Sequence, residues 1–137
     1  MPELNWALLS DHTRLELSGV AHILAAGIDT VTAPAVPATQ SIGIVASIAF
    51  TRNECGRLHS LEMLFQGEDG QSLAKIKGTT TPEYDESLPP GWHMNTLVAF
   101  NLPLPLPAYG NYSVEILIDD QTKQSLRLRV RPPAEGP

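Results

Sequence analysis

The final part of the chain carries the pattern that most restricts the fold. Between Asn111 and Arg131, apolar and polar side chains alternate along two arms that are separated by a polar Asp-Asp turn. Because successive side chains of a β-strand point to opposite faces, this segment predicts a hairpin with one buried face and one solvated face. The residues predicted to be buried are Tyr112, Val114, Ile116 and Ile118 in the first arm, and Leu126, Leu128 and Val130 in the second. A lone hairpin is marginally stable in water, so we expect the rest of the chain to cover this face.

The preceding chain reads as a series of short strands with turns between them. Further strands are predicted over residues 4–10, 15–18, 41–51, 58–66, 71–78 and 94–102, with 102–107 extended. Residues 11–14 and 67–70 are expected to be turns, and 79–91 a long loop. Residues 33–38 contain two prolines, which exclude a helix and favour an extended crossing. Residues 20–28 fit a helix or a strand; Gly19 within a helix would cost about 1 kcal/mol relative to alanine, so a strand is favoured.

Many short strands without a long helix indicate an all-β fold. The expected architecture is an antiparallel two-sheet β-sandwich of Greek-key, immunoglobulin-like type. Gly110 lies two residues before Tyr112 at a strand entrance, which is similar to the tyrosine corner of immunoglobulin-like folds. The 137 residues, of which 42% are hydrophobic, fit a single domain with a core over about residues 4–131 and a flexible tail over 132–137.

The order of several short motifs resembles a bacterial and phage family of small β-sandwich proteins known only as a domain of unknown function. The motifs are Leu8-Leu9-Ser10-Asp11, Gly19 to Ile23, Gly27 to Thr30, Pro34 with Pro37, Gly56-Arg57 with His59, Glu68-Asp69-Gly70, and Tyr109 to Asp119. The resemblance spans roughly residues 4–131. It implies a sandwich and no assigned activity, and it carries over no catalytic residue.

Charge and composition restrict the classes of partner. The net charge of −6 argues against a broad basic surface, so nucleic acid is not expected as a partner. No apolar run approaches the roughly 20 residues needed to span a bilayer, and the first ten residues lack the pattern of a signal peptide. We therefore expect a cytoplasmic protein that does not bind membranes. Cys55 is the single cysteine, so an intramolecular disulfide is impossible.

The residue types used in catalysis or metal binding form no recognisable motif. The histidines, which lack the short paired spacings of zinc ligands, are His12, His22, His59 and His93. Acidic residues also gather at predicted loops, but they are ordinary in turns and form no calcium-loop motif: Asp11, Asp29, Glu68, Asp69, Asp119 and Asp120. Cys55 lies near Arg52 and Arg57, which would lower its pKa, and His59 would be its base, but no third orienting group is evident. No catalytic residue, cofactor or metal site is therefore predicted.

Two surfaces remain as candidates for binding. Gly43, Val45, Ser47 and Ala49 form a small, mostly apolar strand face that we expect to lie under the proline crossing or under a second subunit. Arg127, Arg129 and Arg131 form a positive stripe that would suit a phosphate or an acidic partner, or would simply be solvated and partly paired with Glu115.

The favoured function is a non-enzymatic interaction or structural module that binds a protein partner or associates with itself. The alternative is a ligand-binding, metal-binding or enzymatic domain with a site in the loops at one end, using His12, His59, His93 and the acidic turns.

Overall fold

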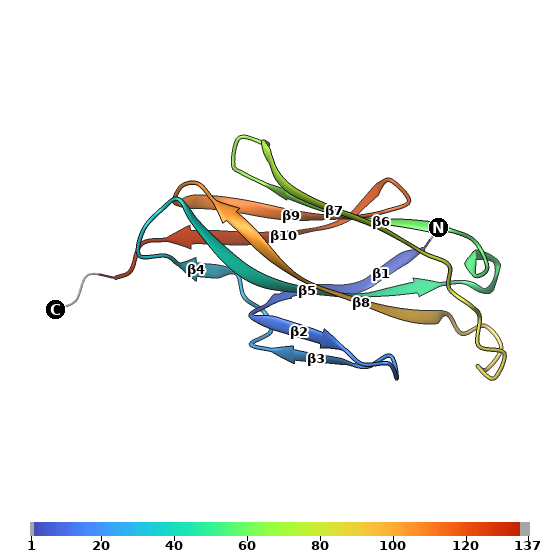
Figure 1. Ribbon diagram of the computed structural model, residues 1–137. Helices are drawn as coiled ribbons and strands as arrows, with labels where there is room; N and C mark the ends of the chain where they lie inside the picture. The colour runs from blue at the N-terminus through green and yellow to red at the C-terminus, as the bar shows by residue number, and fades with distance from the viewer. Residues whose placement is uncertain (1, 135–137) are drawn as a thin grey trace.

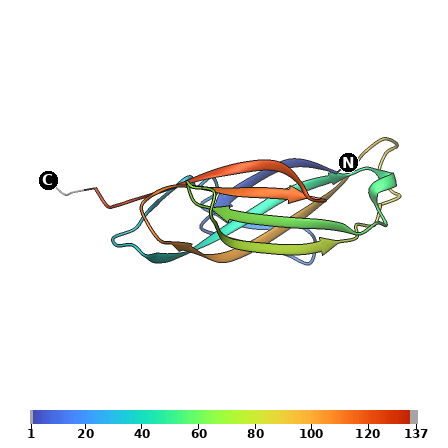
Figure 2. The same cartoon turned by 90° about the horizontal axis from the view of Figure 1, so that it is seen from above.

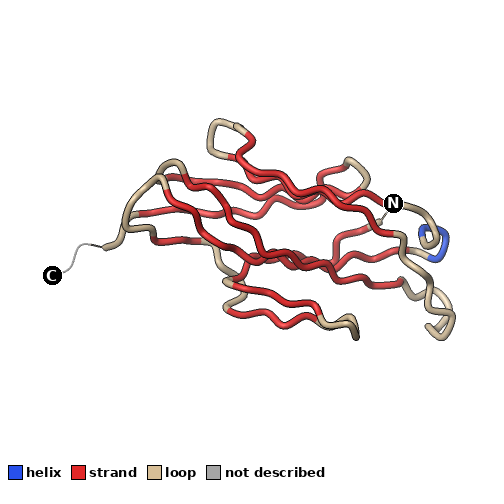
Figure 3. Tube along the Cα trace, viewed as in Figure 1, coloured by secondary structure: helices blue, strands red, loops and turns tan. Residues whose placement is uncertain are grey.

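The computed structural model describes residues 2–134, and β-strands account for most of them (Figure 3). The strands are β1 (Glu3–Ser10), β2 (His12–Leu15), β3 (Ala21–Leu24), β4 (Thr30–Thr32), β5 (Ala38–Phe50), β6 (His59–Gln66), β7 (Ser72–Thr80), β8 (Met94–Leu106), β9 (Gly110–Ile118) and β10 (Gln121–Arg131). A short 3-10 helix, η1, spans Arg52–Glu54. The predicted all-β fold is confirmed, and the segment 20–28 contains strand β3 rather than a helix. Part of the predicted flexible tail, residues 135–137, lies outside the described residues.

Two sheets pack face to face, and a hairpin lies outside them (Figure 1). One sheet has the order β1-β5-β8 and the other the order β4-β10-β9-β6-β7. The places of β1, β5 and β8 match strands A, B and E of an immunoglobulin sandwich, and those of β6, β9 and β10 match C, F and G. The β2–β3 hairpin is an addition to this plan. The sandwich is antiparallel as expected, with the exception that the short strand β4 runs parallel to β10.

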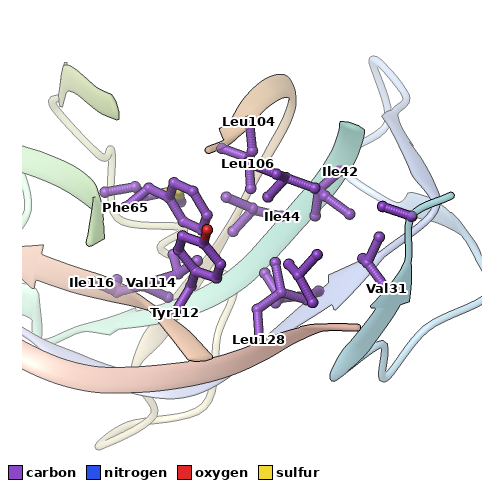
Figure 4. Packing of buried hydrophobic residues seen from close by; sticks show 14 residues of the cluster. Val31, Ile42, Ile44, Phe65, Leu104, Leu106, Tyr112, Val114, Ile116 and Leu128 are labelled. Carbon is purple, nitrogen blue, oxygen red and sulfur yellow. The ribbon is translucent and has the colours of Figure 1, made fainter. Parts of the chain in front are cut away.

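The core fills the space between the two sheets (Figure 4). The largest cluster takes Ile42 and Ile44 from β5, and Leu104 and Leu106 from β8, on one side. The other sheet contributes Phe65, Tyr112, Val114, Ile116 and Leu128. The alternation that predicted the final hairpin therefore places its apolar side chains in the core, as expected.

Tyr112 forms the predicted tyrosine corner. Its hydroxyl donates to the carbonyl of Ala108 at 2.5 Å and accepts from the N–H of Ala108 at 3.2 Å. The ring also stacks on Phe65, with ring centroids 5.2 Å apart. The corner thus fixes the connection between β8 and β9, where the chain passes from one sheet to the other.

The segment 94–106 is one continuous strand, although two prolines interrupt its sequence. This strand, β8, is an edge strand of its sheet. Its Pro103 and Pro105 lie opposite Ser41 and Thr39 of β5. Proline is tolerated in an edge strand because the N–H that it lacks is not required by a second neighbour.

The predicted turn at residues 11–14 and the predicted strand at residues 15–18 are both wrong in their position along the chain. Residues His12–Leu15 form β2, and the turn that joins it to β3 follows at 16–20. The polar sequence His-Thr-Arg suggested a turn, but Thr13 is buried against the neighbouring sheet and holds the segment extended.

Candidate interaction surfaces

The small-residue face of β5 lies inside the molecule. Val45 is fully buried, Ala49 is 4% exposed and Ser47 is 5% exposed. A Cβ atom on Gly43 would lie 2.5 Å from Oγ of Ser10 and 3.1 Å from the carbonyl carbon of His12. Strand β2 therefore lies directly on Gly43. We expected this face to lie under the proline crossing or under a second subunit. The proline crossing does not cover it, because residues 33–37 join β4 to β5 at one end of the sandwich (Figure 1).

The side chain of Asn101 attaches the β2–β3 hairpin to the three-stranded sheet. Its Nδ2 donates to the carbonyl of Thr13 at 2.6 Å, and its Oδ1 accepts from the N–H of Thr13 at 2.9 Å. The N–H and C=O of Thr13, which point away from β3, therefore bond to this amide instead of to a neighbouring strand. Thr13 lies opposite Ile23 in the hairpin. Because backbone groups alternate between the two sides of an antiparallel strand, the N–H and C=O of Ile23 and of Ala21 point to the outer edge of β3.

The hairpin carries a concentration of exposed apolar side chains. Leu15 is 44% exposed, Val20 is 53% exposed and Leu24 is 62% exposed, while Leu17 at the turn is fully exposed. These are four of the eight large hydrophobic side chains that are exposed within residues 2–134. No strand among the described residues pairs with the outer edge of β3. The hairpin therefore presents both an open strand edge and apolar side chains.

The arginine stripe is exposed, which both the binding and the solvated interpretation require. Arg127, Arg129 and Arg131 are exposed on the outer side of β10. The expected pairing with Glu115 is wrong, because Glu115 lies opposite Ser125 and accepts a hydrogen bond from its hydroxyl at 2.8 Å. Within residues 2–134 the three guanidinium groups form no ion pair.

The four histidines lie in separate places. His12, His22 and His93 are exposed, and His22 contacts Glu16 at 2.5 Å. His59 is 6% exposed and lies between two acceptors, the carboxylate of Asp119 and the carbonyl of Glu54. Among residues 2–134, no three His, Cys, Asp or Glu side chains are placed to hold a metal ion together.

Several of the acidic candidates accept hydrogen bonds. Oε1 of Glu68 accepts the N–H of Asn111 at 2.6 Å, and Oδ1 of Asp69 accepts the N–H of Gln71 at 3.0 Å. Oδ1 of Asp29 accepts from the Thr30 hydroxyl at 3.1 Å. Asp11 and Asp120 are exposed. Asp69 thus makes the kind of contact expected in a turn, whereas Glu68 bonds to the start of β9, 43 residues away.

The arginines near Cys55 in the sequence do not lower its pKa. Burial, together with the charge of Glu54, raises the pKa of the Cys55 thiol above its ordinary value. Arg52 instead contacts Glu86 and lies over the ring of Tyr84, 5.0 Å from its centroid. A thiol with a raised pKa is a poorer nucleophile at neutral pH.

Sequence reasoning missed the Asn101–Thr13 contact, the open edge of β3 and the His59–Asp119 pair. The first and third join residues 88 and 60 positions apart, and no local pattern signals them. The apolar residues Leu15, Leu17, Val20 and Leu24 were the one available signal for the hairpin surface.

Within residues 2–134, no helix has the length and apolar character needed to cross a membrane.

Comparison with known proteins identifies a family. A search of curated proteins found no match. A glycosyl hydrolase family 2 member from Bacteroides cellulosilyticus is similar in structure, with a TM-score of 0.46 and 15% sequence identity over 72% of this chain. The match spans 13% of that much longer protein. Residues 5–131 match the profile of a family of unknown function, DUF6941, and the chain therefore belongs to that family.

Proposed function

We propose that the protein is a non-enzymatic interaction module that associates with a second copy of itself through the β2–β3 hairpin. The observation that carries the proposal is the exposure of Leu15, Leu17, Val20 and Leu24 on one small hairpin. Apolar side chains gathered in this way typically mark a protein–protein contact.

The open edge of β3 supports the choice of a second copy as the partner. The strand sequence Ala-His-Ile-Leu contains none of the lysine or proline residues that commonly protect an edge strand. Two β3 strands related by a two-fold axis would pair in antiparallel fashion through the backbone groups of Ala21 and Ile23. A four-stranded sheet would result, in which Val20 of one hairpin lies across from Leu24 of the other.

The test is light scattering on a sizing column, with native mass spectrometry of the same peak, from micromolar to millimolar protein. We expect a dimer whose mass is twice that of the chain. A protein that remains monomeric over this range would overturn the proposal.

Two variants locate the contact. Leu24→Lys places a charge among the exposed apolar side chains, and we expect it to shift the equilibrium to monomer. Ile23→Pro removes an N–H that faces the open edge and that the β2–β3 ladder does not use, so it should have the same effect. The matched control is Leu58→Lys, because Leu58 is 70% exposed and lies outside the hairpin. Dimers that persist in both hairpin variants would place the contact elsewhere and overturn the assignment to β3.

A further inference from the structure

A groove of about 760 Å³ follows the open side of the sandwich between β1 and β10. Ala7 and Leu9 of β1 line one wall, and Ser125, Arg127 and Leu128 of β10 line the other. Figure 2 shows β10 at the border of its sheet, beside β9 and away from β6 and β7. The groove therefore lies where the two sheets come together without a strand closing the gap.

Strand β4 covers only the last part of β10. Thr30–Thr32 pair with Arg129–Arg131, and the preceding chain turns away towards β1. There the N–H groups of Gly27 and Ile28 both donate to the carbonyl of Leu9, at 2.8 and 3.1 Å. Among the described residues, no strand pairs with the outer edge of β10 from residue 121 to residue 128.

The hydrogen bond at the β4 end of the groove shows which backbone groups of β10 face the groove. The N–H of Arg129 donates to the carbonyl of Asp29 at 2.8 Å, so the backbone of Arg129 points away from β9. Since this direction alternates along a strand, the N–H and C=O of Arg127 and Ser125 also point into the groove. They are placed to pair with an added strand.

The charges beside this edge select the kind of strand. Four of the nine lysine and arginine residues of an acidic protein lie in β10: Lys123, Arg127, Arg129 and Arg131. The side chains of Arg127 and Arg129 are exposed on the outer face, whereas Leu126 and Leu128 point towards the core. An added strand would therefore place acidic side chains beside the arginines and apolar side chains towards the core. Asp29 lies at the β4 end of the groove, so an acidic side chain fits best beside Arg127.

We propose that the free edge of β10 accepts an extended acidic peptide of a protein partner as an additional strand. Backbone hydrogen bonds would supply much of the affinity, and the arginines would select the charge of the peptide, as in other cases of strand addition. This surface is separate from the β3 edge and is proposed independently of self-association.

The probe is a fluorescent peptide of alternating glutamate and valine, with an alternating lysine and valine peptide as its charge-reversed counterpart. Fluorescence anisotropy should show binding of the acidic peptide only, and affinity should fall as salt is raised. NMR should show the largest amide shifts at Ser125 to Leu128 and at Ala7. The measurement is repeated in Leu24→Lys, so that its result does not depend on the β3 contact.

Variants of β10 decide the outcome. Arg127→Glu should weaken binding of the acidic peptide at least about tenfold. The substitution replaces an attractive charge pair with two like charges. Arg57→Glu makes the same change at an exposed arginine outside the groove and should leave binding unchanged. Ser125→Pro removes an N–H that faces the groove and should abolish binding, while thermal melting confirms that the variant is folded. The proposal is overturned by absence of binding, by equal affinity for both peptides, by equal affinity of Arg127→Glu and wild type, or by amide shifts centred on β3.

Discussion

The Nδ1 atom of His59 lies 2.7 Å from Oδ2 of Asp119, and this contact joins the start of β6 to the turn between β9 and β10. The other ring nitrogen, Nε2, lies 2.6 Å from the carbonyl oxygen of Glu54. Because both ring nitrogens face acceptors, only the doubly protonated imidazolium donates to both. Burial on its own lowers the pKa of His59, but the hydrogen bonds to Glu54 and Asp119 and their charges outweigh it, so the pKa lies above its ordinary value.

The raised pKa of His59 predicts that stability falls as the solution becomes alkaline. A histidine whose pKa is higher in the folded state contributes its full stabilisation below the unfolded pKa of about 6.5. This contribution is lost as the pH rises through the higher folded pKa. We therefore expect the free energy of unfolding, measured by urea denaturation, to decrease from just above pH 6 towards pH 9.

His59→Gln identifies the source of this pH dependence. The variant should be less stable than wild type at pH 6 and should lose most of the slope above that pH. His93→Gln, at an exposed histidine, should keep the slope. An unchanged slope in His59→Gln would assign the titration to another group.

The tyrosine corner predicts a measurable loss of stability in Tyr112→Phe. The substitution keeps the stacked ring but removes the hydroxyl that bonds to both backbone groups of Ala108. We expect the free energy of unfolding to fall by about 1–2 kcal/mol, because two part-buried hydrogen bonds to the backbone of Ala108 are lost.

Tyr84→Phe is the matched control for the tyrosine corner. The hydroxyl of Tyr84 donates to the carbonyl of Trp92 at 2.9 Å in an exposed loop, where water replaces it. The loss there should stay below about 0.5 kcal/mol. Equal losses in the two variants would mean that the corner has no special role.

Much of the sandwich could be predicted because its strands carry strong local patterns. The alternation from Tyr112 to Ile118 and the glycine before Tyr112 indicated both a buried face and a tyrosine corner, and the structure contains both. Strand β4 has three residues, which is too short for a periodic pattern, so its parallel pairing with β10 could not be predicted. The register of β10 changes at an irregularity between Thr122 and Gln124, after which Glu115 lies opposite Ser125, and the alternation of apolar and polar residues alone does not fix this register.

The candidate surfaces were less predictable because they depend on contacts between distant segments. The small residues of β5 correctly suggested close approach by another element, but not that β2 would be that element. Thr13 is polar and follows Asp11 and His12, so its burial depends on the amide of Asn101, which is 88 residues away. Without this contact the hairpin has no fixed position, and its exposed residues cannot be recognised as a surface.

Asn101→Ala should release the β2–β3 hairpin while leaving the sandwich folded. The substitution removes both hydrogen bonds to Thr13 and leaves its N–H and C=O without partners. We expect hydrogen exchange to become much faster in residues 12–24 and to stay slow in β5 and β9. Asn53→Ala, at an exposed asparagine in η1, should leave both regions unchanged. Uniformly faster exchange throughout the chain would instead show that the hairpin and the sandwich unfold together.

Gly43→Ala should push strand β2 away from strand β5 by steric contact. The new Cβ would lie 2.5 Å from Oγ of Ser10 and 3.1 Å from the backbone of His12, and the backbone has little freedom to move away. We expect a loss of about 1–3 kcal/mol in the free energy of unfolding, as for other overpacked sites. Gly78→Ala in β7 is the control, because a Cβ there meets nothing within 4 Å and alanine restricts the unfolded chain. If both variants were as stable as wild type, β2 would not rest on β5 in solution, and the small-residue face would again be open to a partner.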